Sequence, residues 1–87
     1  MSEPIRVLYF AWLRERVGVA QEELALPEGV GTVAALVDYL AARDARHAAA
    51  FRDGRTVRCA VNQEFADLSS AVQPGDEVGF FPPVTGG

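Results

Sequence analysis

One segment of this sequence carries a clear helical pattern, and it lies between segments with the character of strands. Within it, apolar residues recur at the spacing i, i+3, i+4 and i+7, at Val33, Leu36, Val37 and Leu40. Thr32 directly precedes them and is a suitable N-cap. We therefore predict a helix over about residues 33–43, with one apolar face that packs on a sheet.

Four segments around this helix are predicted to be strands. Residues 5–10, 57–62 and 77–81 are rich in β-branched and aromatic residues, and residues 22–26 alternate weakly. The first and the last strands carry strong apolar residues, so we expect them to lie together in the centre of the sheet. The second strand is expected to run antiparallel to the first.

Shorter elements complete the pattern. Residues 11–17 are predicted to form a short helical turn that stops at Gly18. Residues 44–51 are predicted to form a second, shorter helix, closed by the Asp-Gly pair at 53–54. The Gln-Pro-Gly-Asp segment at 73–76 is a turn signal that separates the last strand from the preceding chain.

The order strand, strand, helix, strands indicates an α+β fold in which one main helix packs on one face of a mixed sheet. The β-grasp arrangement has this order. A ferredoxin-like sandwich requires a second long helix late in the chain, and residues 63–75 are too short and too broken by proline and glycine. The 87 residues fit one domain, which we place at residues 1–81, followed by an extended tail at 82–87.

Charge and apolar runs exclude several classes of function. Twelve acidic and eight basic residues give a net charge of −4, which repels phosphate backbones, so we expect no nucleic-acid partner. The longest strongly apolar run, residues 7–13, is too short to cross a bilayer, and we expect neither a membrane association nor a signal peptide. The single cysteine, Cys59, cannot form an intramolecular disulfide and fits a reducing, cytoplasmic location.

Side chains that usually carry catalysis are scarce. His47 is the only histidine, and we predict a surface or partly packed position for it rather than a catalytic one. Cys59 shares a strand face with Val57 and Val61, which favours a small buried hydrophobe over a reactive thiol. No cysteine and histidine have metal-ligand spacing, so we expect neither a metal nor a bound cofactor.

The C-terminal segment has clearer chemical meaning. Its sequence is Phe81-Pro82-Pro83-Val84-Thr85-Gly86-Gly87, and the prolines stop the last strand and hold the chain extended. The two glycines remove every side chain near the terminal carboxylate, so the tail can thread a narrow channel. The Gly87 carboxylate lacks a good leaving group, so acyl chemistry there requires prior activation, as by adenylation.

This ending resembles the MoaD/ThiS family of sulfur carriers, and within it the small subunits of molybdopterin synthase. The residues that match are Gly75-Asp76-Glu77-Val78-x-Phe80-Phe81 with the tail that follows, Val61-Asn62-Gln63, and Phe10-Ala11-x-x-Arg14-Glu15-x-x-Gly18. Together they span nearly the whole chain. Trp12, Cys59 and the absence of lysine depart from the family pattern, but none of these departures lies in the tail.

The resemblance implies a ubiquitin-like β-grasp fold and a role in molybdenum cofactor biosynthesis. In that family an E1-like, ATP-dependent adenylyltransferase activates the terminal carboxylate, here that of Gly87. Sulfur from a sulfurtransferase then replaces the adenylate and leaves a thiocarboxylate. The tail inserts into the large subunit of molybdopterin synthase and donates sulfur to cyclic pyranopterin monophosphate. The assembly is a heterotetramer, and the catalytic side chains are expected on the large subunit rather than on this chain.

Strand alternation predicts the surface that meets these partners. Val78 and Phe80 share a face and are expected in the core, so Phe81 points outward beside the tail. Phe10 lies on the outward face of the first strand. We hypothesise that Phe10, Phe65 and Phe81 form an exposed apolar patch for both protein partners.

Three other functions stay open from the residues alone. A carrier for thiamine, cysteine or tRNA thiolation shares the terminal diglycine, although thiamine-type carriers tend to be shorter and lack the Phe-Phe-Pro-Pro-Val-Thr ending. A ubiquitin-like modifier is joined to target proteins through its last glycine, and isopeptide-linked adducts in cell extract favour it. A plain interaction module predicts that deletion of Gly87 has no consequence.

Overall fold

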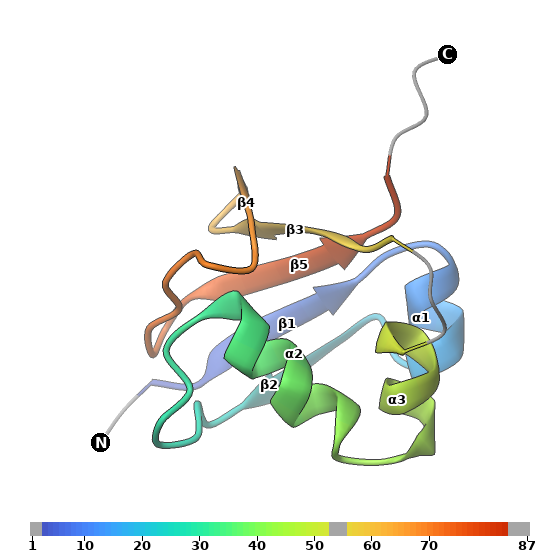
Figure 1. Ribbon diagram of the computed structural model, residues 1–87, viewed down its shortest axis with the longest axis horizontal. Helices are drawn as coiled ribbons and strands as arrows, with labels where there is room; N and C mark the ends of the chain where they lie inside the picture. The colour runs from blue at the N-terminus through green and yellow to red at the C-terminus, as the bar shows by residue number, and fades with distance from the viewer. Residues whose placement is uncertain (1–2, 53–55, 84–87) are drawn as a thin grey trace.

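The computed structural model describes residues 3–52 and 56–83. Its helices and strands follow the predicted order, with one additional strand (Figure 1). The elements are β1 (Ile5–Tyr9), α1 (Trp12–Val17), β2 (Gln21–Leu24), α2 (Val33–Ala41), α3 (Ala45–Phe51), β3 (Arg58–Val61), β4 (Glu64–Ala66) and β5 (Glu77–Phe81).

Within the described residues, five strands form one mixed sheet with the order β2-β1-β5-β3-β4. β1 runs parallel to β5, with Tyr9 opposite Phe80, and every other neighbouring pair is antiparallel. The prediction that the first and last strands lie together in the sheet centre is therefore confirmed. A parallel pair requires a long crossover connection, and α2 and α3 lie within it.

The helices α2 and α3 lie over one face of the sheet (Figure 1). α2 begins at its predicted N-cap, Thr32, whose Oγ1 accepts a hydrogen bond of 3.2 Å from the Ala35 backbone N–H. The buried core joins the apolar face of α2 to the inward face of the central strands. It includes Val33, Leu36 and Leu40 from α2, Ile5, Val7 and Tyr9 from β1, and Val78 and Phe80 from β5. This architecture is the predicted α+β β-grasp fold.

The ends of the helices follow local chemistry. α1 stops at Gly18, which adopts the left-handed conformation (φ 96°) that favours glycine, as predicted. α2 ends at Ala41, two residues before the predicted end, because the chain turns into a new N-cap. That cap is Asp44, whose carboxylate accepts from the His47 backbone N–H at 2.8 Å. The predicted closure of α3 at 53–54 lies outside the described residues.

The strand β4 was not predicted, because its three residues are too few to show alternation. It pairs antiparallel with β3 through a two-residue turn, Asn62 and Gln63, in which both residues have positive φ (51° and 69°). Such hairpin turns usually contain glycine, so their sequence signal is absent here. Asn62 Oδ1 accepts from the Glu77 backbone N–H at 3.0 Å, which ties the turn to the start of β5.

No helix among residues 3–52 and 56–83 is long and apolar enough to cross a membrane.

Candidate functional site

The tail leaves the sheet at the C-terminal end of the central strand. β5 ends at Phe81, and Pro82 and Pro83 follow it as half-buried and exposed residues. Since β1 and β5 are parallel, the end of β1 lies at the same edge, and the Phe10 backbone N–H donates to the Phe80 carbonyl at 3.1 Å. The remaining predicted tail residues, Val84, Thr85, Gly86 and Gly87, lie outside the described residues.

The face of the sheet opposite α2 and α3, which we call the open face, has small residues on its central strands. Across it, Leu8 of β1 pairs with Gly79 of β5, Gly79 pairs with Ala60 of β3, and Ala60 pairs with Phe65 of β4. The two middle residues of this row carry little or no side chain. The larger residues Leu8 and Phe65 stand on either side of these two, and the ring of Phe10 lies over Gly79.

The three phenylalanines of the predicted patch all lie on the open face, and we call them the aromatic patch. Phe10 is 48% exposed and Phe65 is 89% exposed, while Phe81 is half-buried. The rings of Phe65 and Phe81 contact each other with centroids 6.0 Å apart. The ring of Phe10 lies over Gly79 of the central strand β5. The predicted outward orientation of Phe10 and Phe81 is thus confirmed, and a role in docking stays a prediction.

A shallow cavity of about 290 Å³ lies beside the pair formed by Phe65 and Phe81. Its lining is mostly apolar and consists of Arg58, Cys59, Phe65, Ala66 and Phe81. Arg58 stands directly opposite Phe81 in the β3–β5 pair and is exposed. The sequence analysis missed Arg58, Ala60 and Gly79 as open-face residues. Strand parity is the signal that could have found Gly79, because it lies two residues before Phe81.

Cys59 behaves as the predicted small hydrophobe. It is 6% exposed and belongs to the core cluster. Burial raises the pKa of its thiol, with a smaller contribution from the negative charge of Asp67. A thiol that stays protonated is a poor nucleophile, so Cys59 is not arranged to carry sulfur chemistry.

His47 occupies a position that the sequence analysis did not anticipate. It is 6% exposed, so the prediction of a surface or partly packed histidine is wrong. Its ring nitrogens lie 2.8 Å from Asp44 Oδ1 and 2.8 Å from Glu22 Oε2. Among the residues that the structure describes, no group of three histidine, cysteine or acidic residues could hold a metal ion.

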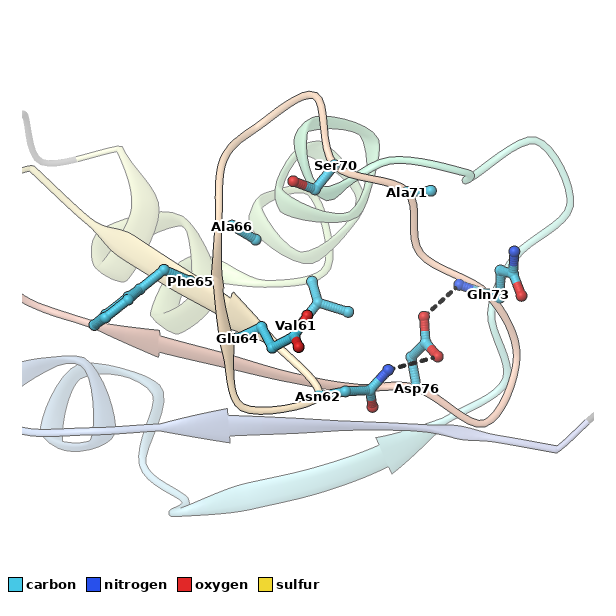
Figure 2. A pocket seen from close by; sticks show the side chains of 9 residues that line it. All are labelled: Val61, Asn62, Glu64, Phe65, Ala66, Ser70, Ala71, Gln73 and Asp76. Atoms are coloured by element: carbon cyan, nitrogen blue, oxygen red, sulfur yellow. Dashed lines mark hydrogen bonds between the residues drawn. The ribbon is translucent and has the colours of Figure 1, made fainter.

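A larger and more polar cavity, of about 370 Å³, lies at the opposite end of β5 (Figure 2). Asp76 organises it, because its Oδ1 accepts from Asn62 Nδ2 at 3.1 Å and its Oδ2 accepts from the Gln73 backbone N–H at 2.9 Å. These bonds hold the turn that precedes β5. The tail leaves from the other end of the strand, and Phe65 and Ala66, which line both cavities, lie between this cavity and Phe81.

Comparison of the sequence and the fold with known proteins identifies relatives of this chain. The chain is 46% identical to the molybdopterin synthase sulfur carrier subunit of Escherichia coli (strain K12) and 41% identical to that of Haemophilus influenzae. Each alignment covers 95% of this chain and 99% of the relative. The solved structure of SAMP1 from Haloferax volcanii aligns with a TM-score of 0.74 at 28% identity, over 97% of this chain and 99% of that chain.

The family model agrees with these relatives. The model of the ThiS family matches residues 7–87, which include the open face, the aromatic patch and the diglycine ending. This match and the full-length relatives establish the classification suggested by the tail and the mixed sheet. The chain belongs to the ThiS family.

Proposed function

We propose that this chain is the sulfur carrier subunit of a molybdopterin synthase and acts in molybdenum cofactor biosynthesis. The observation that carries the proposal is the identity of 46% and 41%, over nearly full length, to two relatives with that name. The diglycine ending supports it, since it places a free carboxylate on the chain without side chains beside it.

The chemistry takes place on the Gly87 carboxyl group. An E1-like adenylyltransferase joins the carboxylate to the AMP portion of ATP and releases pyrophosphate, which converts a poor leaving group into a good one. The terminal sulfur of a sulfurtransferase persulfide then attacks the acyl carbon and AMP leaves, which gives an acyl disulfide. A second thiol reduces this disulfide, becomes oxidised itself, and leaves a thiocarboxylate on Gly87. The sulfur is an anionic nucleophile on a covalent tether, which replaces a diffusional search for free sulfide.

The chain divides the work between a folded part and a tail. Residues 1–81 form the docking domain, and residues 82–87 form the segment that enters the large subunit. The six tail residues can reach about 20 Å when fully extended. Within that reach, sulfur is delivered to cyclic pyranopterin monophosphate by catalytic side chains of the partner in a heterotetramer. The buried thiol of Cys59 fits a reducing compartment, and we place this chemistry in the cytoplasm.

The aromatic patch is the surface that we assign to docking. Phe10 and Phe65 are large, exposed apolar residues, and Phe81 directly precedes the tail. Interfaces concentrate binding energy in such aromatic residues when they become fully desolvated. A partner that covers the aromatic patch also receives the tail, because both lie at the same edge of the sheet.

A second function has one observation in its favour. The solved structure of SAMP1, the small archaeal modifier protein 1 of Haloferax volcanii, shares the fold at a TM-score of 0.74 and 28% identity. A modifier uses the same activated C-terminus, but a lysine amine of a target protein takes the place of sulfur. Isopeptide-linked adducts of this chain in cell extract support the modifier, and a discrete thiocarboxylated monomer supports the carrier.

Reconstitution tests the proposal. The purified chain is treated with ATP, an E1-like adenylyltransferase, a sulfurtransferase with its sulfur donor, and a thiol reductant. Intact mass spectrometry is expected to show replacement of one oxygen by sulfur at Gly87. The product is then mixed with the large subunit and cyclic pyranopterin monophosphate, and molybdopterin is measured. A chain without Gly87 is the matched control and is expected to yield none. Molybdopterin formation that does not depend on thiocarboxylated Gly87 contradicts the proposal.

A further inference from the structure

An arginine stands among the apolar residues at the base of the tail. Arg58 of β3 lies directly opposite Phe81 of β5, and residues directly opposite each other share one face of a sheet, so its side chain is on the open face. It is exposed, and it lines the shallow cavity of about 290 Å³ together with Phe65 and Phe81. The aromatic patch therefore has a cation at its edge, beside the last strand residue before Pro82.

The guanidinium of Arg58 has no partner in the part of the chain that the structure describes. No hydrogen bond or ion pair joins it to a residue of 3–52 or 56–83. Asp67 lines a smaller cavity with Arg58, but its Oδ1 accepts from the Ser69 backbone N–H at 2.8 Å and from the Ser69 hydroxyl at 2.6 Å. These bonds hold the Asp67 carboxylate in its own turn rather than against Arg58.

A second arginine of the open face provides a contrast. Arg6 of β1 lies opposite Glu77 of β5, and Arg6 Nη1 is 3.6 Å from Glu77 Oε2. This ion pair is at the start of β5, whereas Arg58 is at the end of the strand, where the tail leaves. Among the described residues, the fold thus supplies a carboxylate for the arginine far from the tail and none for the arginine beside it.

Docking changes the surroundings of Arg58. The proposed function requires a partner that covers Phe65 and Phe81, and both of these residues line one cavity with Arg58. A surface that excludes water from the two rings also removes water from the adjacent guanidinium. Removal of a charge from water is unfavourable unless an opposite charge and hydrogen-bond acceptors replace the water. The partner therefore has to supply acceptors at this position.

A carboxylate is the group that meets this requirement best. The planar guanidinium donates two parallel hydrogen bonds to the two oxygens of one carboxylate, a geometry that a single carbonyl oxygen cannot match. The carboxylate also neutralises the charge of Arg58. Arginine and aromatic residues are enriched where interfaces concentrate their binding energy, so Arg58 beside Phe65 and Phe81 fits such a cluster.

We propose that Arg58 pairs with an aspartate or a glutamate of the large subunit, on the part of that subunit which covers the aromatic patch. This proposal rests on the proposed function, and it adds the chemistry of the partner's surface, which is an apolar area with a carboxylate beside the entrance for the tail. Because Arg58 stands opposite Phe81, the ion pair fixes the register of the two proteins at the residue from which the tail extends.

Binding to the purified large subunit tests the pair and requires no modification of Gly87. Affinities of the wild type, Arg58→Gln and Arg58→Glu are measured by isothermal titration calorimetry at low and at physiological ionic strength. Loss of the positive charge in Arg58→Gln is expected to weaken binding about tenfold, and charge reversal in Arg58→Glu is expected to weaken it further. Added salt is expected to weaken wild-type binding more steeply than binding of Arg58→Gln, because only the wild type retains the ion pair.

Arg6→Gln is the matched control. It removes a positive charge from the same face of the sheet, at the opposite end of β5, and leaves the aromatic patch intact. Its affinity for the large subunit is expected to stay close to that of the wild type, and equal losses in Arg6→Gln and Arg58→Gln overturn the proposal. Since Arg58 is exposed, urea unfolding of its variants is expected to match the wild type, which separates docking from folding.

Charge exchange identifies the carboxylate on the partner. Large-subunit variants, each with one surface aspartate or glutamate replaced by arginine, are combined with Arg58→Glu. One of them is expected to restore binding to Arg58→Glu and to weaken binding to the wild type. Wild-type affinity of Arg58→Gln, or failure of every such variant to restore binding, overturns the pair.

The wild-type chain separates this proposal from the proposed function. If the wild type binds the large subunit and its thiocarboxylate yields molybdopterin, a negative result with the Arg58 variants removes only the ion pair. Absence of binding by the wild type contradicts the proposed function itself.

Discussion

The ring of Phe10 lies over Gly79, so that a Cβ atom at position 79 would be 3.4 Å from Phe10 Cε2. This distance is ordinary van der Waals contact for a methyl group but leaves no room for a branched side chain. The absence of a side chain at Gly79 therefore allows the ring of Phe10 to pack directly against the backbone of the central strand.

Substitution of Gly79 tests this contact. Gly79→Ala is expected to change the free energy of unfolding by less than about 1 kcal/mol, because the added methyl only touches the ring. Gly79→Val is expected to cost about 1–3 kcal/mol, since its extra methyl groups overlap the ring position. Urea unfolding measures both values. In a Phe10→Ala background the cost of valine is expected to fall, and an unchanged cost contradicts the packing account.

Phe65 is expected to contribute to binding and not to stability. It is 89% exposed, so Phe65→Ala is expected to change the free energy of unfolding by no more than about 0.5 kcal/mol. The affinity of the Phe65→Ala chain for the large subunit is expected to fall at least tenfold, because Phe65 is expected to be a central aromatic residue of the interface. This loss corresponds to about 1.4 kcal/mol of binding free energy. Isothermal titration calorimetry measures the affinity.

Leu68 supplies the matched control for Phe65. It is also an exposed apolar residue, at 60%, but it does not belong to the aromatic patch. It lines one cavity with Val33 and Val37 of α2 and another with Arg58 and Ala66. Leu68→Ala is therefore expected to keep full affinity for the large subunit. Equal losses for Phe65→Ala and Leu68→Ala would remove the aromatic patch as the docking surface.

Cys59 is expected to be unreactive in the folded chain. Its burial excludes reagents and raises the pKa of the thiol, so little thiolate is present near neutral pH. Alkylation by iodoacetamide is expected to be much slower in buffer than in denaturant, as followed by mass spectrometry. Cys59→Ala is expected to retain sulfur transfer from Gly87. Rapid labelling of the native chain, or loss of transfer in the variant, contradicts this prediction.

Acid is expected to destabilise the chain through Glu22 and Asp44. In the folded chain the pKa values of both carboxyls are lowered, so their contribution to stability is present above the ordinary carboxyl pKa. It is lost as the pH falls through the folded values, because protonation removes the charge that the hydrogen bonds favour. Urea unfolding from pH 7 down to acid pH measures this loss.

The matched variant for this prediction is Glu22→Gln. It retains the size of the side chain but removes its charge, and it is expected to lower the free energy of unfolding at neutral pH by about 1.5–3 kcal/mol. Its stability is also expected to depend less on pH than that of the wild type in the acid range. A variant with the wild-type acid profile contradicts a role for Glu22.

Local chemistry was sufficient to predict most of the elements. The i, i+3, i+4, i+7 spacing from Val33 and the cap at Thr32 predicted α2, because helical periodicity and capping act within a few residues. Alternation in β1 and β5 predicted which residues are buried, and hence that Phe10 and Phe81 face outward. The tail could be interpreted for the same reason. Its two prolines and two glycines determine the local backbone conformations that are available without any tertiary contact.

Contacts between distant residues depended on the fold itself. β4 forms only because it pairs with β3. The turn between them, at Asn62 and Gln63, contains no glycine from which it could have been predicted. The bond between His47 and Glu22 joins residues 25 positions apart. No periodicity encodes such a pair, because it exists only after the crossover from β2 to α3 has brought the two elements together. The sequence by itself determined the order of elements, their buried faces and the chemistry of the tail. The tertiary structure alone decided that a histidine predicted to be at the surface or partly packed is buried between two carboxylates, and that the ring of Phe10 lies over Gly79.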